Sequence, residues 1–464
     1  MKIKLAKTEN IHFIGIGGIG MSGLAIIMKG LGFRVQGSDL YLSKNVERLK
    51  KRKIKTFLKH KKDNVKNTTI IVISSAIKKN NPEIVEARRR NLPIYKRGEM
   101  LGHIVSLMKN IVVAGSHGKT TTTSLISSIF SKTKIDPTII NGGVLNSNGN
   151  SAKLGKSDWG ILEADESDGS FLDIPTTYSI ITNVDKEHLD FYTSMKKLRK
   201  DFIKFIEKTP SFGKSYICID DLENKNILKN LNTKNFLTYG VNKKSNFKIK
   251  NVRHNIKFSS FDLSISVPGK KRDEINKIQI PIIGLHNIRN ATAAVAVCYT
   301  IGISKKIIKN GLRKFQGVQR RFNHIFTYRN SKFIDDYAHH PTEISSVLES
   351  IKLVYKNEKL VCIFQPHRVS RLNNLKNEFS KCFKSADYLI LCPIYKAGEN
   401  IKLRFNYEKF AKEIIKNSGV QLFLVKNSED LIKFVKQNIF GKNIVIGMGA
   451  GTISNWIRMM PEKL

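Results

Sequence analysis

The sequence has few cysteines, and this shortage excludes two kinds of small scaffold. Its 464 residues include 5 Cys, an odd number with no C-x-x-C pair. This argues against a disulfide framework or a zinc site, and it favours buried free thiols in a reducing compartment. The five are Cys218, Cys298, Cys362, Cys382 and Cys392.

A long, purely apolar run is also missing. The stretch from Ile11 to Met28 carries no formal charge, but it contains five glycines and lies between strand and helix patterns. We therefore expect no membrane span there, and no secretory signal is recognisable. The sequence predicts a cytoplasmic protein.

Acidic residues are scarce relative to basic ones. Lys and Arg number 80 against 38 Asp and Glu, which gives a net charge of +42. Such a charge raises nucleic acid as a partner, but the lysines are scattered over every segment without an aromatic-interleaved stripe. We therefore expect no nucleic-acid partner, and we expect the charge to attract anionic small molecules.

Three times the chain repeats the order of a short apolar strand, a glycine turn and a helix, and it has no internal repeat of 20 to 50 residues. This order is typical of parallel sheets covered by helices. We predict an α/β fold of three domains, each a mostly parallel sheet with helices: a Rossmann-like domain, a central P-loop domain and a second Rossmann-like domain. Their predicted ranges are 1–108, 109–318 and 319–464.

Finer expectations concern two of these domains. In the first, we predict strands at 11–16, 33–37 and 69–74, and a helix that begins near Pro82. In the second, the lysine-rich region 240–280 has alternating patterns that predict an antiparallel insertion.

The sequence "GSHGKTT" from Gly115 to Thr121 follows an apolar strand and opens a helix. Backbone N–H groups in such a turn point at one anion, and the helix N-terminus adds positive potential. Lys119 can reach the β- and γ-phosphates, and the Thr120 hydroxyl can bind Mg²⁺. The full P-loop pattern requires Gly at 113, where this chain has Val113, so the loop is a shortened variant that still predicts ATP binding.

Acidic residues gather after the next two apolar strands, where the sites of α/β proteins lie. Oxygen ligands of this kind suit Mg²⁺, although a solvated acidic loop would have the same composition. His188 stands in the second group as a further candidate ligand. The two groups are Glu163, Asp165, Glu166 and Asp168, and then Asp185, Glu187, His188 and Asp190.

The first glycine loop has Gly15, Gly17 and Gly20 in the order G-x-G-x-x-G, and Asp39 follows 19 residues after Gly20. This spacing predicts a diphosphate at a helix start and a carboxylate at a ribose hydroxyl. NAD has both groups, and so does a UDP-sugar. The P-loop favours the UDP-sugar, because a nicotinamide redox enzyme has no use for ATP.

The C-terminal third has two clusters of donors. In "QPHRVSR", Arg368 and Arg371 stand three residues apart, a spacing compatible with one helix face. In "DYAHHPTE", Pro341 opens a helix, so His339 and His340 precede its positive end, which favours neutral imidazole. Such groups suit a reaction that builds negative charge on oxygens, although a basic helix start would look the same.

Ten ordered motifs resemble the Mur ligase family over essentially the full length, and "GIGGIGMS" and "DDYAHHPTE" favour its alanine-adding member. The resemblance implies a UDP-sugar domain, an ATPase domain and an amino-acid domain. It implies that ATP phosphorylates the lactyl carboxylate of UDP-N-acetylmuramate and that L-alanine attacks the acyl phosphate, in peptidoglycan precursor synthesis. The other motifs are "SSAIKKNNPE", "GSHGKTTTT", "EADESDGSF", "TNVDKEHLD", "GLHNIRNATAA", "GVQRRF", "FQPHR" with Arg371, and "GAGTIS".

The resemblance also implies residue roles, with ATP and Mg²⁺ as cofactors. The catalytic residues are Lys119, His188, His339, Arg368 and Arg371. The ATP-binding residues are Gly115, Ser116, His117, Gly118, Lys119, Thr120, Thr121, Asn287, Asn290, Arg321 and, at the ribose, Asp335. The substrate-binding residues are Gly15, Gly17, Gly18, Gly20, Asp39, Ser74, Ser75 and His367. The metal ligands are Thr120, Glu163 and His188.

One departure concerns a carbamylated lysine that several relatives carry, since this chain has Ile203 at that spacing. We therefore assign no such group, and we expect a monomer or homodimer in which "FQGVQRRFN" is a hinge region. Three alternatives remain. They are a recycling ligase that adds a preformed murein peptide to the same sugar nucleotide, a nucleotide-binding or RNA-associated scaffold, and a nicotinamide dehydrogenase.

Overall fold

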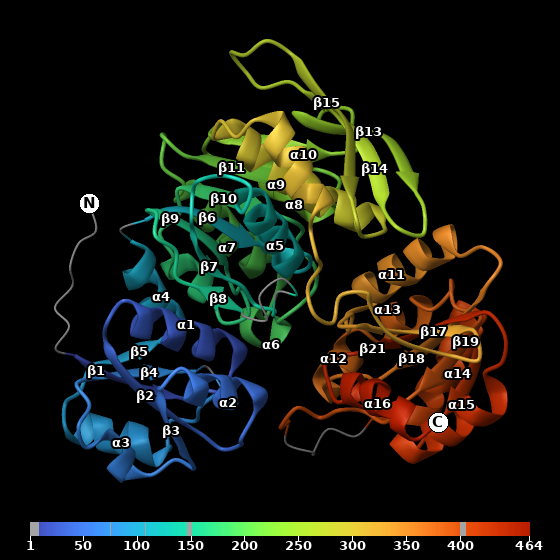
Figure 1. Ribbon diagram of the computed structural model, residues 1–464, viewed down its shortest axis with the longest axis horizontal. Coiled ribbons are helices and arrows are strands. Elements are labelled where there is room, and N and C mark those ends of the chain that lie inside the picture. Colours follow the sequence, from blue (N-terminus) through green and yellow to red (C-terminus); the bar gives the residue numbers. More distant parts are fainter. Residues whose placement is uncertain (1–8, 75, 107, 145, 147–150, 400–404) are drawn as a thin grey trace. The chain divides into compact units, whose positions relative to one another are not determined.

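The computed structural model describes residues 9–74, 76–106, 108–144, 146, 151–399 and 405–464. In these residues the chain forms three separate sheets, each with helices and each made mostly of parallel strands (Figure 1). The predicted α/β class with three such sheets is therefore confirmed. Ser75 lies outside the described residues.

The N-terminal sheet is wholly parallel, in the order β3-β2-β1-β4-β5. The chain runs outward from β1 to one side and then returns to the other, so the loop after β1 lies at the topological switch point, where α/β sheets bind ligands. The three predicted strands are present, with ends that differ by at most two residues. The elements are β1 Asn10–Ile14, α1 Ile19–Gly30, β2 Arg34–Asp39, α2 Lys44–Lys51, β3 Lys55–Leu58, η1 Lys62–Val65, β4 Ile70–Ile73, α3 Pro82–Arg89, β5 Ile94–Lys96 and α4 Arg97–Val105.

The central sheet has the order β15-β14-β13-β12-β11-β10-β6-β9-β7-β8. Its strand β6 lies between β9 and β10, so the P-loop that follows it is again at a switch point. The elements are β6 Lys109–Ala114, α5 Lys119–Phe130, β7 Thr138–Ile140, β8 Ala152–Lys153, β9 Trp159–Glu163, η2 Ser170–Asp173, β10 Tyr178–Ile181, α6 Leu189–Tyr192, α7 Met195–Glu207, β11 Lys214–Cys218, α8 Leu222–Lys229, β12 Phe236–Gly240, β13 Phe247–His254, β14 Ser259–Ile265, β15 Asp273–Ile280, α9 Leu285–Thr300 and α10 Lys305–Arg313.

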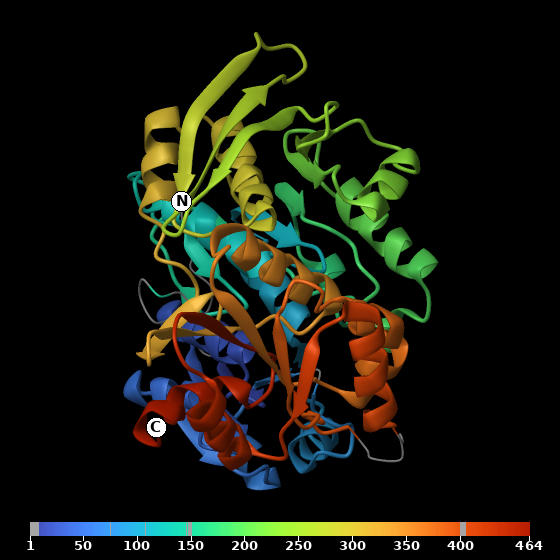
Figure 2. The same cartoon turned by 90° about the vertical axis from the view of Figure 1, so that its right-hand side faces the viewer.

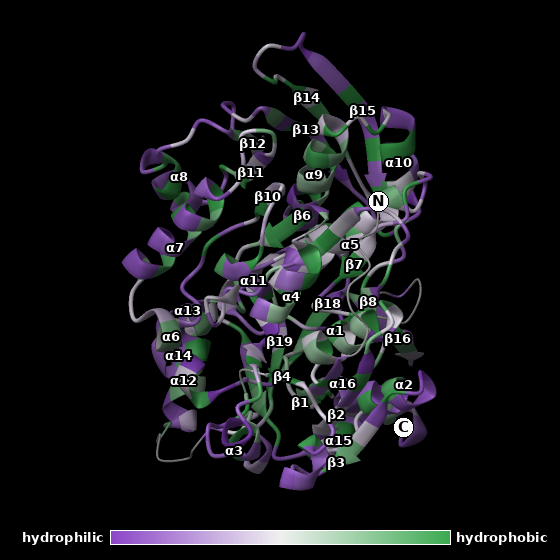
Figure 3. Cartoon of the chain, turned by 90° about the vertical axis from the view of Figure 1, so that its left-hand side faces the viewer, coloured by the Kyte–Doolittle hydropathy of each residue, from purple (hydrophilic) through white to green (hydrophobic). Residues whose placement is uncertain are grey.

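Strands β13, β14 and β15 form the insertion predicted for 240–280. They are neighbours in the sheet and are joined only by residues 255–258 and 266–272. Connections this short allow antiparallel pairing alone, because a parallel crossover needs a dozen or more residues. In Figure 3 the inner strands β6 and β10 have mostly hydrophobic colouring, whereas α7 and α8 carry long hydrophilic segments.

The C-terminal sheet has the order β16-β17-β21-β18-β19-β20, with only β16 antiparallel to its neighbour. Alternate residues of β18 belong to two different apolar clusters, so both sheet faces are covered by helices (Figure 2). The elements are β16 Asn323–Tyr328, β17 Ser331–Asp336, α11 Pro341–Val354, β18 Lys359–Phe364, α12 Val369–Asn374, α13 Lys376–Lys381, β19 Tyr388–Leu391, α14 Tyr407–Ser418, β20 Gln421–Leu424, α15 Ser428–Asn438, β21 Asn443–Met448, α16 Ile453–Met459 and η3 Met460–Glu462.

By its contacts the chain divides into two compact units. The first comprises the described residues up to Val252 together with Ser260–Ile280 and Arg289–Gly317. The second comprises Arg253–Ser259, Pro281–Ile288 and the described residues from Val318 onward. The first predicted domain and most of the second thus belong to one unit, whereas residues 253–259 and 281–288 of the second belong to the other. The boundaries predicted at 108 and 318 stay predictions.

Helix α1 explains the uncharged stretch that resembles a membrane span. Residues Met21–Met28 are all buried. On one side, a Cβ added at Gly23 would lie 3.0 Å from the Cβ of Ala152, and one at Gly30 would lie 2.9 Å from Leu154. The helix is therefore apolar because it packs against both its own sheet and strand β8 of the central sheet. Among the described residues, no helix is long and apolar enough to cross a membrane.

A buried polar cluster holds the N-terminal sheet together around Glu83, which is 0% exposed. Its carboxylate accepts hydrogen bonds from Ser38 Oγ and Asn64 Nδ2, both at 2.6 Å, and its Oε2 lies 3.0 Å from His60 Nδ1. His12 Nε2 lies 3.5 Å from Oε1. Burial raises the pKa of Glu83, but the hydrogen bond and charge of His12 and the donors Ser38 and Asn64 outweigh it, so the pKa lies below its ordinary value.

We expect Glu83→Gln to lower the melting temperature, because a buried anion surrounded by donors is replaced by an amide that presents its own N–H to them. The loss should be about 3 kcal/mol near neutral pH. A carboxyl whose folded pKa is depressed stabilises above its unfolded value and loses this effect as pH falls, so the difference from wild type should narrow below about pH 4.5. Thermal unfolding at several pH values measures this, with Glu86→Gln as control, since Glu86 pairs with the exposed Arg89 on the same helix. Equal losses in both variants would contradict the prediction.

All five cysteines are buried and free, in agreement with the prediction of buried thiols. Burial raises the pKa of Cys298 and Cys362, which keeps them protonated and unreactive.

Candidate active site

The first glycine loop lies directly after β1. Gly15 has φ +82, a left-handed conformation that favours glycine, and the N–H groups of Gly15 and Ile16 donate to the carbonyl of Ser38 at 2.9 and 3.0 Å. The Gly17 N–H donates to Asp39 Oδ2 at 2.8 Å. The loop and the predicted ribose carboxylate are therefore in direct contact at the N-terminus of α1.

Gly17 has no room for a side chain. A Cβ added there would lie 2.8 Å from Asp39 Oδ2 and 2.9 Å from Val46 Cγ2. Gly18 belongs to the same loop, and Ser74 follows β4, where its N–H donates to the Ile14 carbonyl at 3.2 Å. The structure thus brings together all the predicted substrate-binding residues of this domain except Ser75, which lies outside the described residues.

We expect Gly17→Val to weaken UDP-sugar binding by at least about 10-fold and to leave ATP affinity nearly unchanged. The added methyl groups would push Asp39 away and block the close approach of a diphosphate to the loop. Isothermal titration with each nucleotide separately measures the two affinities, with the smaller Gly17→Ala as a graded variant. Equal loss of both affinities would show that the substitution disturbs the whole fold rather than this loop.

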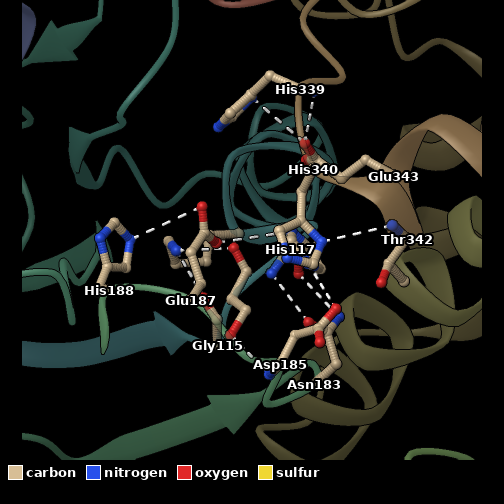
Figure 4. A network of polar contacts seen from close by, with 12 residues as sticks. Gly115, His117, Asn183, Asp185, Glu187, His188, His339, His340, Thr342 and Glu343 are labelled. Carbon is tan, nitrogen blue, oxygen red and sulfur yellow. Dashed lines mark hydrogen bonds and ion pairs between the residues drawn. The ribbon is translucent and has the colours of Figure 1, made fainter. Parts of the chain in front are cut away.

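The P-loop follows β6, and it is held by Thr182 and Asn183, which follow the neighbouring strand β10. Gly115 has φ +130, and a Cβ there would lie 2.1 Å from Thr182 Oγ1, so this position requires glycine. Asn183 accepts from the Ser116 N–H with its carbonyl and from the His117 N–H with Oδ1, both at 2.9 Å. Figure 4 shows His117 beside Asp185, with Nε2 at 3.1 Å from Oδ2. The loop conformation is therefore fixed by residues about 65 positions later in the chain.

Lys119 is anchored inside this loop. Its ammonium donates to the Gly115 carbonyl at 2.5 Å, to the Ser116 carbonyl at 3.2 Å and to Glu166 Oε1 at 2.8 Å. Burial lowers the pKa of Lys119, but the charges of Glu166 and Glu163 outweigh it, so the pKa lies above its ordinary value. Burial raises the pKa of Glu166 to about 7, although Lys119 opposes this shift. The ammonium is thus held charged and oriented at the start of α5.

The predicted metal ligands fall into two groups. Thr120 Oγ1 donates to Glu163 Oε1 at 3.1 Å, at the carboxyl ends of β6 and β9. His188 groups instead with Glu166 and Glu187, and ligand atoms of these three residues lie within 4.8 Å of one another. His188 has φ +56, a rare conformation for a non-glycine residue and one that is concentrated at functional sites. The first group offers oxygen atoms and the second offers carboxylate oxygens with an imidazole, and both kinds of atom can bind a divalent cation.

Asn290, on α9, packs against the P-loop. A Cβ added at Gly118, which has φ +83, would lie 2.5 Å from Asn290 Oδ1. Asn287 is on the first turn of the same helix, where its side chain donates to the Ile283 carbonyl at 2.7 Å. Their predicted contacts with the nucleotide remain predictions.

In the second unit, the loop after β17 carries a cluster around Glu343 and Tyr337. The N–H of His339 donates to Glu343 Oε2 at 3.2 Å, and Arg321 Nη1 donates to Glu343 Oε1 at 3.2 Å (Figure 4 shows His339 and Glu343). The guanidinium of Arg321 lies 5.3 Å from the ring centre of Tyr337, over its face. The carboxylate of Glu343 therefore holds both predicted site residues, His339 and Arg321.

The loop after β18 carries a second cationic cluster. Arg371 Nη1 lies 3.0 Å from His367 Nδ1, and the His367 ring stacks on Tyr395 at 5.6 Å. Burial and the charge of Arg371 lower the pKa of His367 to about 3, so the ring is neutral. Because Arg371 donates to Nδ1, the ring proton is on Nε2. Arg368 has φ +69, again a left-handed conformation at a predicted site residue.

Asp335 has an environment that the prediction of a ribose contact did not anticipate. Its side chain is 0% exposed, and its Oδ2 accepts from Ser454 Oγ at 2.6 Å and Arg458 Nη2 at 2.8 Å. These contacts connect β17 to α16. The ribose role of Asp335 stays a prediction.

Sequence reasoning did not assign roles to several residues that support the site. They follow strands of three different sheets, and only two of them, Thr182 and Asn183, stand in a quoted motif. They are Arg97, Thr182, Asn183, Tyr395 and Glu399, the last of which accepts from the Val369 N–H at 2.7 Å at the start of α12.

Three segments of the chain match one protein family in order. Residues 10–109 match the "Mur ligase family, catalytic domain", residues 113–298 the "Mur ligase middle domain", and residues 320–451 the "Mur ligase, glutamate ligase domain". A UDP-N-acetylmuramate–L-alanine ligase of Pelagibacter ubique is 66% identical over 464 residues, which is 100% of both chains. One of Brucella anthropi is 40% identical over 98% of this chain and 97% of that protein.

Solved structures agree with the sequence relatives. A UDP-N-acetylmuramate–alanine ligase from Thermotoga maritima is 28% identical with a TM-score of 0.82, over 98% of this chain and 99% of that one. A murein peptide ligase from Psychrobacter arcticus has a TM-score of 0.73 at 21% identity over 98% of both chains, which shows a shared fold. From its matched segments and its full-length relatives, the chain belongs to the Mur ligase family.

Proposed function

We propose that this chain is an ATP-dependent ligase that joins L-alanine to the lactyl carboxylate of UDP-N-acetylmuramate. The observation that carries this proposal is the full-length 66% identity to an enzyme of that name. The recycling ligase has weaker support, since the solved murein peptide ligase is only 21% identical.

Two separate anion cradles in one unit fit a reaction with two nucleotides. The loop after β1 offers backbone N–H groups and Asp39 to a diphosphate and a ribose. The loop after β6 offers the same kind of backbone together with the ammonium of Lys119. The first cradle binds the UDP of the sugar substrate, and the second binds ATP.

The residues present fit Mg²⁺ as a cofactor. Thr120 and Glu163 form one pair of oxygen ligands, and Glu166, Glu187 and His188 form a second group. Thr120 with Glu163 would hold an ion at the ATP phosphates, and His188 with its carboxylates would hold another. When bound, Mg²⁺ neutralises charge on the phosphoryl oxygens.

The reaction has two steps. A lactyl carboxylate oxygen bonds to the γ-phosphorus of ATP as the bond to the bridging oxygen breaks and ADP leaves. The nitrogen of the free alanine amine then bonds to the acyl carbon as the bond to the phosphate oxygen breaks, phosphate leaves, and the nitrogen loses one proton to the departing phosphate and keeps one N–H. Both steps build negative charge on oxygens, so the protein acts by positioning and electrostatics.

The chain supplies side chains in fixed positions that can stabilise this negative charge. Lys119 is held against the P-loop carbonyls before a phosphate arrives, so it needs little reorganisation. Arg371 is oriented by the neutral ring of His367, whose Nε2–H can donate to a substrate oxygen. The backbone N–H of His339 donates to Glu343, in the first turn of α11. We propose these residues, with Arg368 and His188, as the catalytic group, and we propose that the enzyme works in the cytoplasm, where its nucleotides are.

ADP release tests the proposed function. We expect ADP to form with UDP-N-acetylmuramate and L-alanine together, and far less when either is omitted. The same assay with L-serine, glycine and a murein tripeptide measures the acceptor specificity. Faster turnover with the tripeptide than with L-alanine would favour the recycling reaction instead.

A further inference from the structure

Arg97 lies between the two cradles and belongs to neither of the two proposed sets of nucleotide-binding residues. It is the first residue of α4, and its side chain is 21% exposed. On one side, Nη2 lies 3.2 Å from Oδ2 of Asp165, in the acidic loop after β9. On the other side, a Cβ added at Gly20 would lie 3.2 Å from both Cδ and Nη1 of Arg97. The guanidinium therefore lies against the glycine loop at the start of α1 while it is paired with an aspartate of the ATPase domain.

The start of α4 is fixed by close backbone contacts. A Cβ added at Gly98 would lie 2.4 Å from Ser170 Cβ, and one at Gly102 would lie 2.7 Å from the Asp173 carbonyl oxygen. The backbone of Arg97 thus cannot move far, but its long side chain has several rotamers that reach different partners. Only the side chain is able to exchange its partner.

Asp165 is held independently of Arg97. Its Oδ1 accepts from the Ser167 N–H at 3.0 Å, and its own carbonyl accepts from the Phe171 N–H at 3.2 Å. Burial raises the pKa of Asp165, but the charge of Arg97 helps to hold this pKa below its ordinary value. The Asp165 side chain is 46% exposed, so solvent and an incoming anion can reach the ion pair. A diphosphate offers more charge and better bidentate geometry to a guanidinium than this carboxylate does.

We propose that Arg97 binds the diphosphate of the sugar nucleotide and that it leaves Asp165 to do so. Asp165 then acts as an internal competitor that holds the guanidinium beside the glycine loop until the substrate arrives. This inference rests on the proposed function, because it takes the first cradle to be the UDP-sugar site. It predicts opposite effects from substitutions of the two partners, which a purely structural ion pair does not.

The test is a double-mutant cycle on binding. Dissociation constants for UDP-N-acetylmuramate, for UDP and for ATP are measured by isothermal titration without turnover. The proteins are the wild type, Arg97→Ala, Asp165→Asn and the double variant, with Arg97→Lys as the charge-conserving variant and melting temperatures as the check on folding. Asp165→Asn keeps an oxygen for the Ser167 N–H.

We expect Arg97→Ala to weaken both UDP ligands by at least about 10-fold, Arg97→Lys to weaken them less, and ATP affinity to stay unchanged. Asp165→Asn should strengthen both UDP ligands about 3-fold, and this gain should disappear in the Arg97→Ala background. The two UDP ligands share the diphosphate but not the lactyl carboxylate. Equal effects on both therefore support the diphosphate as the group that is bound.

Several results would overturn the inference. If Asp165→Asn weakens binding as much as Arg97→Ala, the pair is a structural link between domains. If Asp165→Asn strengthens binding equally in the wild type and in the Arg97→Ala variant, the gain is a general effect of charge and Arg97 does not exchange partners. If only UDP-N-acetylmuramate responds, Arg97 binds the carboxylate instead. Failure of the wild type to bind either UDP ligand would overturn the proposed UDP-sugar site itself.

Discussion

Lys119→Ala should lower the rate of ADP release by at least about 10²-fold while the chain stays folded. The structure fixes the ammonium directly in the P-loop, where it contacts the Gly115 and Ser116 carbonyls and Glu166. Removing a preorganised charge next to a transferring phosphoryl group costs rate rather than only affinity. Initial rates at saturating substrates measure the effect.

The substitution also leaves Glu166 without its cation, and this carboxyl is already buried with a pKa raised to about 7. We therefore expect some loss of stability, and rates should be compared well below the melting temperature of the variant. Lys132→Ala is the matched control, because Lys132 lies exposed just beyond the end of the same helix α5. Near-normal turnover in Lys119→Ala, or an equal loss in the control, would overturn the assignment of the ATP site.

The glycine loops were predictable because their requirement is local. Gly15, Gly115 and Gly118 all have positive φ, and at Gly115 and Gly118 a Cβ would collide with a neighbour. A strand, such a turn and a helix within about 20 residues define a cradle without knowledge of the rest of the fold. The same local reasoning correctly gave the α/β class.

The partners of the loops were not predictable, because they come from sheet order. Asn183 supports the P-loop only because β10 is the neighbour of β6, and Glu163 reaches Thr120 only because β9 is the other neighbour. Nothing in the local sequence states which strand ends will be adjacent. Arg97 is a stronger example, since its partner Asp165 belongs to a different predicted domain.

The contacts of a side chain in the fold also distinguish residues that a motif alone treats alike. Glu163 and His188 were predicted as ligands of the metal, and the structure groups one with Thr120 and the other with Glu166 and Glu187. Asp335 and the adjacent Asp336 look alike in sequence. Asp335 pairs with Arg458, whereas Asp336 accepts from the Phe322 N–H at 2.7 Å, and burial raises its pKa to about 6.

Arg371→Ala should lower kcat on the order of 10²-fold and change the dissociation constant of UDP-N-acetylmuramate little. Its guanidinium is oriented by the neutral His367 ring, in the second unit, whereas the proposed UDP cradle belongs to the first. Its charge should matter most when phosphoryl and acyl oxygens gain negative charge, and an interaction of this kind lowers kcat rather than ground-state binding.

The experiment pairs steady-state rates with titration of the sugar nucleotide, and it uses Lys381→Ala, an exposed lysine at the end of α13, as the control. His367→Ala should reproduce part of the loss in kcat, because Arg371 would keep its charge but lose the ring that orients it. If Arg371→Ala keeps kcat and raises only the KM for ATP, the arginine is a clamp on bound ATP. The catalytic role proposed for the loop after β18 would then be wrong, and the chemistry would depend on the P-loop and its metal ligands.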